Sequence, residues 1–317
     1  MAESFTGRTP FAAKSRMQIV RTRLWRSRYI YLMILPVVAY YLVIHYWAMG
    51  WLSIAFYDYR LLRGFAGSQF VGLQNFKDFV TGINFFPVVR NTVLLNVFSL
   101  IFSFPVPIIF AILLNELRGM KFKRIVQTVS YLPHFLSAVV IVSMLTVILS
   151  PSSGIVNGIM KSIGLGSVYF MGEPDWFRPI YILSGIWQEM GWSAIIYISA
   201  LSGINPDLYE AARVDGAGRF RQIWHVSLPG IRTTIILLVI MRIGHLMGSS
   251  FEKPFLMQND LNNSVAEVLA TYTYKVGLVR GSYSLSTAIG LFNSIISLIL
   301  VTVANTISKK LSDISLF

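Results

Sequence analysis

The sequence predicts an all-α integral membrane protein that crosses the membrane six times, with both termini in the cytoplasm. Hydrophobic residues make up 55% of the 317 positions and charged residues only 13%, whereas a soluble domain carries roughly 25% charged residues. Six windows are long and apolar enough for transmembrane helices, because a hydrocarbon core of about 30 Å needs roughly 20 residues. Lys and Arg are unevenly shared between the segments that connect these windows, which gives the spans their direction.

The six predicted spans together form one membrane domain. They lie near residues 30–54, 92–115, 126–149, 180–201, 232–250 and 286–306. The first window has a basic lead, as a signal peptide has, but its apolar run is too long and no small-residue cleavage site follows. We therefore interpret it as an uncleaved span. A basic tail over residues 1–29 precedes the six-span domain of residues 30–306, and a second tail follows over residues 307–317.

The connecting segments fall into two groups. The N-terminal tail, the loops after the second and fourth spans and the C-terminal tail hold seventeen Lys and Arg residues, and the other three loops hold nine. With Asp and Glu subtracted, the first group carries +11 and the second +2. The first group is predicted to be cytoplasmic, because positive loops stay on that side. Topology and attraction to anionic lipid account for the net charge of +13, so nucleic acid is not expected as a partner.

Residues 205–231 form a polar segment inside an otherwise apolar chain, and the charge distribution places it in the cytoplasm. Asn205 or Asp207 caps a first helix. Gly216 and Gly218 interrupt the helical path, because glycine adopts positive φ without strain. A second helix is expected to carry three apolar residues and to end at a proline: Phe220, Ile223, Trp224 and Pro229.

Small and acidic side chains lie together on the first of these helices. Ala211 and Ala212 form a small face that allows close approach of another backbone, and Glu210 and Asp215 bracket it with charge. A solvated loop gains nothing from this arrangement, so a cytoplasmic protein that docks on the helix is the simplest interpretation. A hairpin that only joins two spans is one alternative. A DNA-binding helix-turn-helix is disfavoured, because it would have to reach a major groove from beneath the membrane.

The spacing of these residues resembles the EAA loop of the integral membrane subunits of ABC importers, in which E-A-A, three residues, G and about nine residues precede I-x-L-P. Here Glu210-Ala211-Ala212 is followed after three residues by Gly216, and nine further residues precede Val226-Ser227-Leu228-Pro229. Val226 stands where the family usually has Ile. The resemblance implies a coupling helix that rests in a cleft of a cytoplasmic ATPase. The residues assigned to this role are Glu210, Ala211, Ala212, Asp215, Gly216, Gly218, Leu228 and Pro229.

The resemblance extends over nearly the whole chain. Segments such as "SYLPHFLSAVVI", "GIWQEMGWSAIIYISALSGINPDLYEAA" and "YSLSTAIGLFNS" look like those of the MalF-type sugar permeases and, within them, the LplB-type branch. The resemblance implies the MetI-like fold of type I importers and a cell-membrane subunit that forms the path for a carbohydrate, either an oligosaccharide or a polysaccharide fragment. It also implies a second permease subunit, an ATPase dimer that binds ATP and magnesium, and an external solute-binding protein. A type I permease for a non-sugar solute is the alternative.

Side chains suited to sugars, which are bound by aromatic faces and neutral hydrogen-bonding groups, gather on the fourth span. They are Trp187, Gln188, Trp192 and Tyr197. We expect them along the substrate path, while the alternative is the belt of Trp and Tyr that any membrane protein carries at its interfaces.

Two ionisable residues lie within spans, Glu189 on the fourth and Arg242 on the fifth. A charge in hydrocarbon costs at least about 2.5 kcal/mol, so both are expected to face protein or a wet cavity and to pair with each other. In one interpretation this pair only fixes the two spans. In the other, both residues line the substrate path, and Arg242 binds the carboxylate of an acidic sugar such as a uronate.

The external segment 252–285 is too long for a plain turn. Val265, Val268, Leu269 and Tyr272 recur in it at helical spacing. This pattern predicts an amphipathic helix and fits a docking surface for the binding protein.

The sequence contains no pattern for catalysis, nucleotide binding or metal binding. No Gly-x4-Gly-Lys-Ser/Thr loop is present, so the chain is expected to depend on a partner for ATP. It has no cysteines, which excludes disulfides and thiolate sites, and its four histidines are scattered. No Ser-His-Asp or His-Glu-x2-His pattern occurs. An intramembrane enzyme is therefore a remote alternative, and no cofactor or metal is expected on this chain.

Overall fold

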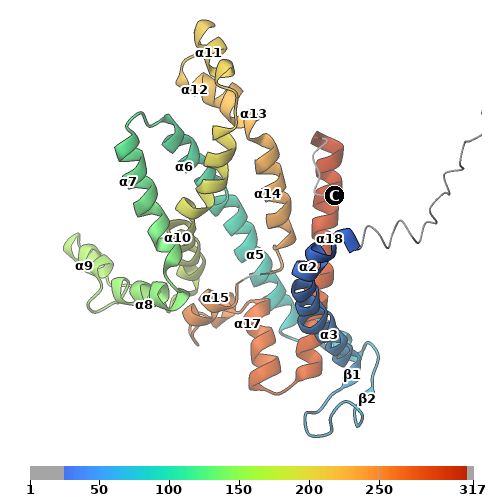
Figure 1. The fold of residues 1–317 in the computed structure, drawn as a ribbon. Coiled ribbons are helices and arrows are strands. Elements are labelled where there is room, and N and C mark those ends of the chain that lie inside the picture. The colour runs from blue at the N-terminus through green and yellow to red at the C-terminus, as the bar shows by residue number, and fades with distance from the viewer. Residues whose placement is uncertain (1–24, 249, 313–317) are drawn as a thin grey trace, which may run out of the picture. The chain divides into compact units, whose positions relative to one another are not determined.

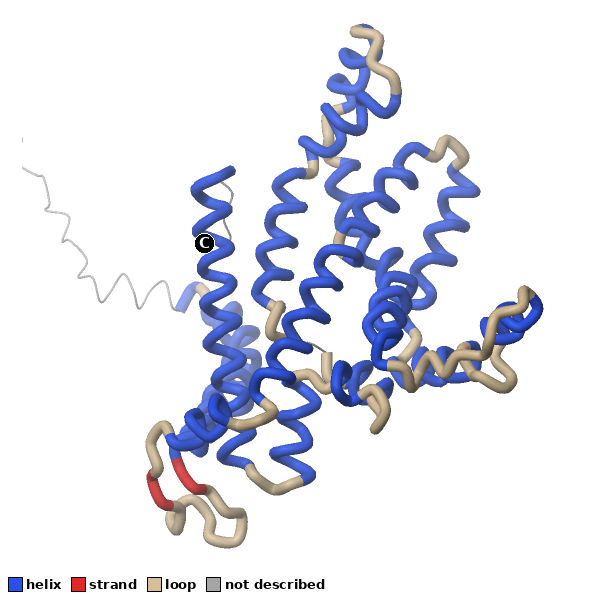
Figure 2. The backbone as a smooth tube through the Cα atoms, turned by 180° about the vertical axis from the view of Figure 1, so that it is seen from behind, coloured by secondary structure: helices blue, strands red, loops and turns tan. Residues whose placement is uncertain are grey.

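The structure, a computed structural model, describes residues 25–248 and 250–312. Most of the predicted basic tail 1–29 and the end of the tail 307–317 lie outside the described residues. Helices form most of the described backbone, and two short strands pair as an antiparallel ribbon (Figure 2). The prediction of a helical protein is therefore confirmed. The chain divides into two compact units, residues 1–53 and 54–317.

The first unit contains one apolar helical stretch. It consists of α2 (Arg28–Tyr40), a π-helical turn (Tyr41–Tyr46) and α3 (Trp47–Gly50), and none of these residues is buried. A helix that is apolar on every side is covered by lipid or by another protein when it is stable. The stretch coincides with the predicted first span 30–54.

The second unit holds the remaining elements (Figure 1). In chain order they are β1 (Tyr57–Asp58), β2 (Gln69–Phe70), α4 (Gln74–Thr81), α5 (Phe85–Ser103), α6 (Pro105–Glu116), α7 (Met120–Tyr131), α8 (Ala138–Ile148), α9 (Ile155–Ser162), α10 (Pro174–Ser202), α11 (Pro206–Val214), α12 (Arg219–Gln222), α13 (Leu228–Gly230), α14 (Arg232–Gly244), α15 (Glu252–Met257), α16 (Asn263–Ala266), α17 (Leu269–Tyr274) and α18 (Tyr283–Ser312).

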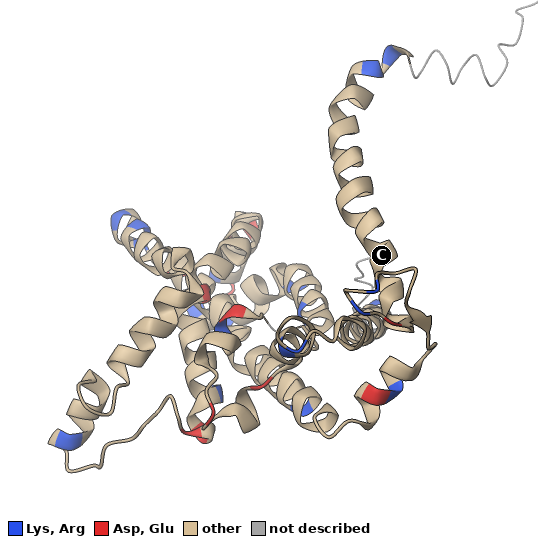
Figure 3. Cartoon of the chain, turned by 90° about the horizontal axis from the view of Figure 1, so that it is seen from below, with Lys and Arg blue, Asp and Glu red and all other residues tan. Residues whose placement is uncertain are grey.

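Several of these helices are apolar enough to cross a membrane. Among the described residues, the continuous stretches Arg28–Phe56, Phe85–Glu116 and Tyr283–Lys310 qualify, and two bent pairs raise the number to five. The predicted fourth span, 180–201, lies within the 29-residue α10, which is more polar than these stretches. Charged side chains are sparse on the long helices (Figure 3). The count of six spans stays a prediction.

The predicted third span, 126–149, is not one straight helix. It is divided into α7, a 3₁₀ turn (Leu132–Phe135) and α8, and the two helices are bent by 99°. Pro133 lies in the turn, and Ser137 begins α8 by accepting a hydrogen bond from the Val140 N–H (3.3 Å). A hydropathy window averages across a bend, which is why the sequence pattern missed it. The predicted fifth span is also too long, because α14 ends at Gly244.

The segment 252–285, which was predicted to be external, also differs from its predicted structure. It contains three short helices, α15 to α17, separated by extended residues such as Val268 (φ −110°, ψ 167°). Val268, Leu269 and Tyr272 are buried, and Val265 packs against the core cluster that contains Val268, whereas Leu269 and Tyr272 belong to another cluster. The predicted single amphipathic helix is therefore wrong, because the extended residue Val268 interrupts it between α16 and α17.

The helix α10 is central to the second unit. It packs against α5, α6, α7 and α16, while α18 packs against α4, α14 and α17. Two of the three hydrophobic core clusters include residues of α10, with Phe177 in one and Tyr197 in the other. The third joins α4, α5, α17 and α18 around Phe79 and Ile289. Helix α10 therefore contributes to one core cluster near its start and to another near its end.

Gly191 permits the close contact of α10 with α7, because a Cβ at this position would overlap the carbonyl oxygen of Ser130. We expect Gly191→Ala to separate the two helices and to destabilise the protein by about 1–3 kcal/mol, as overpacking does. Thermal unfolding in detergent measures the effect. Gly290→Ala on α18 is the matched control, since a Cβ there meets nothing within 4 Å. Equal unfolding temperatures for the two variants would contradict the prediction.

Candidate functional site

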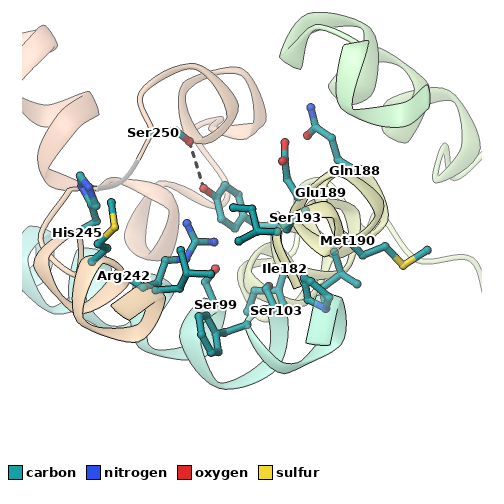
Figure 4. A pocket seen from close by; sticks show the side chains of 18 of the residues that line it. Ser99, Ser103, Ile182, Gln188, Glu189, Met190, Ser193, Arg242, His245 and Ser250 are labelled. Atoms are coloured by element: carbon teal, nitrogen blue, oxygen red, sulfur yellow. Dashed lines mark hydrogen bonds between the residues drawn. The ribbon is translucent and has the colours of Figure 1, made fainter. Parts of the chain in front are cut away.

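A cavity of about 440 Å³ lies in the second unit between α5, α6, α10, α14 and the start of α15. Its walls carry hydroxyl, amide and charged groups from every one of these elements except α6 (Figure 4). Four of the six predicted path residues line it: Gln188, Glu189, Tyr197 and Arg242. Trp187 and Trp192 are not among the residues that line it.

A regular stripe on α10 forms one wall of the cavity. Tyr181, Gly185, Glu189, Ser193 and Tyr197 line it at intervals of four residues, and such residues share one face of a helix. This spacing is the signal that could have identified Tyr181 and Ser193 from the sequence. Residues contributed by other elements carried no such signal: Ser99, Ser103, His245, Ser250 and Lys253.

Glu189 pairs with His134 and not with Arg242. The Nδ1 atom of His134 lies 3.0 Å from Glu189 Oε2 and 3.2 Å from Oε1, whereas the ion pairs of the described residues include none to Arg242. Figure 4 shows the Glu189 and Arg242 side chains entering from different helices. The expected Glu189–Arg242 pair is therefore wrong. The Glu189 side chain is 45% exposed, so the hydration that it keeps reduces the cost of its charge.

Trp192 contacts the same histidine. Its ring stacks on His134 with centroids 4.4 Å apart and an interplanar angle of 3°. One face of this indole is therefore covered by protein, which was not predicted from the sequence. Trp187 is 43% exposed and lies outside the cavity lining.

Two cations face the cavity without a carboxylate at ion-pair distance in the described part of the chain, Arg242 and Lys253. Lys253 is only 8% exposed. Its Nζ donates a hydrogen bond to the Tyr181 carbonyl oxygen (3.3 Å) and lies 5.1 Å from the centroid of the Tyr181 ring. Burial lowers the pKa of Lys253 to about 8, while the negative charge of Glu189 opposes this shift. The cavity is thus suited to an anionic group.

The polar segment 205–231 forms the expected first helix. The Asn205 side chain caps α11 by accepting a hydrogen bond from the Asp207 N–H (3.0 Å). Gly216 follows the helix with φ of +74°, a conformation that costs other residues roughly 1–2 kcal/mol. The Tyr209 hydroxyl lies 3.0 Å from Ser227 Oγ. This hydrogen bond connects α11 to the helical turns that lead into α14.

The second helix of this segment does not end at Pro229 as predicted. After α12 it continues through a π-helical turn (Ile223–Ser227) into α13, which extends to Gly230. Pro229 lies directly after the π-helical turn, near the end of this continuous helix. The break falls at Ile231, before α14 begins.

The surface of this segment is uncovered. No residue of α11 or α12 is buried, and of the eight residues assigned to coupling, Ala212 and Leu228 are half-buried and the other six exposed. Large apolar side chains are also exposed, including Val214 (88%), Phe220 (79%) and Trp224 (61%). Figure 1 shows α11 and α12 beyond the ends of α10 and α14. Such a patch is typical of a surface that another protein or a membrane covers.

The cavity with polar walls between apolar helices, together with the exposed segment beyond them, indicates a membrane transport protein that acts with a partner subunit. The chain belongs to the family of binding-protein-dependent transport system inner membrane components, whose model matches residues 79–313. This match confirms the resemblance to ABC importer permeases and the membrane location.

Individual relatives agree with this assignment. The chain is 44% identical over 292 residues to protein LplB of Bacillus subtilis, covering 92% of both chains. It is 43% identical over 300 residues to the polygalacturonan/rhamnogalacturonan transport system permease protein YteP of the same organism, covering 95% of this chain and 94% of the relative. The crystal structure of a bacterial alginate ABC transporter, in complex with a periplasmic protein that carries an alginate pentasaccharide, contains a chain that matches with a TM-score of 0.86 and 37% identity, covering 93% of this chain and 99% of that one.

The buried amine of Lys253 is expected to reduce stability at neutral pH. Its pKa falls from 10.5 to about 8, so the charged form is disfavoured in the folded protein by roughly 3 kcal/mol. This cost is fully present below about pH 8 and disappears as the pH rises towards 10.5. Lys253→Met should therefore raise the unfolding temperature at pH 7 and raise it less at pH 10. Lys161→Met, at an exposed lysine, is the control, and a lower unfolding temperature for Lys253→Met at pH 7 would contradict the prediction.

Proposed function

We propose that this chain is the permease subunit of an ABC importer whose cavity passes an oligosaccharide that bears carboxylates. The observation that carries the proposal is the presence of Arg242 and Lys253 on the cavity wall, with no carboxylate at ion-pair distance among the described residues. Lys253 is buried, and a buried charge without a carboxylate partner costs several kcal/mol, which a substrate carboxylate would offset. Polygalacturonan and alginate, for which relatives are named, are carboxylate-bearing polymers.

The remaining path residues suit the neutral part of a sugar. Gln188 and Tyr197 line the cavity with amide and hydroxyl groups, which exchange hydrogen bonds with sugar hydroxyls. Trp187 and the uncovered face of Trp192 would meet the substrate only outside the cavity. The alternative of a non-sugar solute is not favoured, because the relatives are named for carbohydrates.

In this proposal the chain acts with partners. A solute-binding protein delivers the oligosaccharide on the external side, and a second permease subunit completes the path. An ATPase dimer, which holds ATP and magnesium, docks on α11 through Glu210, Ala211 and Ala212. Six spans with both termini in the cytoplasm place this segment on the ATPase side. The exposed apolar side chains of residues 208–224 support such a docking surface.

Gly216→Pro should weaken the association with the ATPase. Proline cannot adopt the φ of +74° at this position and lacks the N–H that Gly216 donates to the Arg213 carbonyl (3.0 Å). Strain of about 1–3 kcal/mol should reduce recovery of the ATPase with the tagged chain by at least about fivefold. Gly164→Pro is the matched control, since Gly164 also has positive φ and donates to a carbonyl three residues before it. Equal recovery with both variants would refute the coupling assignment.

Arg242→Ala should reduce uptake of an acidic oligosaccharide by about tenfold or more, because it removes a charged partner of the substrate. Uptake of a neutral oligosaccharide of the same length should fall much less. The measurement is ATP-driven uptake into proteoliposomes that contain the whole importer, with Arg242→Lys as the variant that keeps the charge. Equal losses for the two sugars would count against an anionic substrate.

A further inference from the structure

Three residues of α10 contact the bend between α7 and α8. The Gln188 side chain donates to the Leu136 carbonyl oxygen (3.2 Å), Glu189 meets His134, and Trp192 stacks on His134. The Trp192 ring also meets Phe135 edge-on, with centroids 5.6 Å apart. The His134 ring is thereby held in one orientation, with Nδ1 directed at the carboxylate.

Glu189 is the one acidic residue that lines the cavity in the described part of the chain. A carboxylate on the cavity wall hinders the passage of an anionic substrate in two ways. It repels the carboxylate of a substrate, and it competes for the cations that would bind that substrate. Its charge already acts on the amine of Lys253, so Lys253 lies within its electrostatic reach.

His134 opposes both effects. Its Nδ1 lies within hydrogen-bond distance of both oxygens of Glu189, and it donates either as the imidazolium or as the neutral tautomer that carries its hydrogen on Nδ1. A carboxylate that accepts this hydrogen bond is turned towards the bend. Its charge is also partly compensated there, so it is a weaker competitor for Lys253 and Arg242.

We infer that His134 determines selectivity for acidic oligosaccharides as a positioning residue, by engaging the Glu189 carboxylate so that Arg242 and Lys253 stay available to the substrate. This inference rests on the proposed function, because it presupposes that the cavity passes an acidic oligosaccharide. It assigns opposite roles to two residues that touch each other: Glu189 lowers the uptake of anions, and His134 prevents it from doing so.

A double-mutant cycle tests the inference. The wild type, His134→Phe, Glu189→Gln and the double variant are each assembled with the partner subunits and binding protein and reconstituted in proteoliposomes. His134→Phe keeps an aromatic ring against Trp192 and removes only the hydrogen-bond donor. The probes are a galacturonate tetramer and its carboxyl-reduced neutral counterpart, and uptake is expressed per recovered complex.

His134→Phe should lower uptake of the acidic tetramer by about fivefold or more, because an unmasked carboxylate interacts with the cations and the substrate at close range. The same substitution should have no such effect when Glu189 is already Gln, and uptake of the neutral tetramer should change less than twofold in every variant. A purely structural role for His134 predicts losses for both probes that Glu189→Gln does not relieve.

The cycle distinguishes a failure of the role assigned to His134 from a failure of the proposed acidic substrate. If the wild type imports the acidic tetramer but His134→Phe leaves uptake unchanged, or lowers it equally with and without Glu189, the role of His134 is overturned and the proposed function stands. If the wild-type importer takes up only the neutral tetramer, the acidic substrate and the role of His134 both fall.

Discussion

Polar side chains inside a membrane must meet either protein or water, and α10 carries a stripe of polar or small residues at every fourth position from Tyr181 to Tyr197. The apolar helices α5, α6 and α14 close around this stripe and leave a cavity along it. Helix α10 also packs against α7 and contributes to two of the three core clusters. Helix α10 therefore carries many of the polar groups of the cavity and also much of the packing that shapes it.

Properties that depend on local sequence were predictable. Hydropathy indicated the apolar helices, and the cap at Asn205 and the positive φ of Gly216 followed from residue types that have strong local preferences. The EAA spacing identified the family before any fold was known. Four of the six predicted path residues also line the cavity, and three of them, Gln188, Glu189 and Arg242, were noticeable because ionisable and amide residues are rare on apolar helices.

Properties that depend on contacts between distant segments were not predictable. His134 and Glu189 are 55 residues apart, and nothing in either neighbourhood indicates the other, so Arg242, the other ionisable residue within a predicted span, was the expected partner. Lys253 lies outside the predicted spans, and the position of α15 brings it to the cavity. The 99° bend was not predicted because both of its arms belong to one apolar window. Val268 was assigned to a single helix because the spacing of apolar residues does not show where a helix is interrupted.

The hydrogen bond between Tyr209 and Ser227 has a mechanical consequence. It fastens α11 to the turns that precede α14, and Ile231 at that junction is fully buried against α6 and α10. Helix α14 has 13 residues and is therefore about 20 Å long, with Arg242 near its far end. A tilt of about 10° about the buried junction would displace that end by about 3 Å. In the proposed coupling, α14 therefore acts as a lever whose short arm lies at the exposed segment 205–231 and whose long arm carries Arg242.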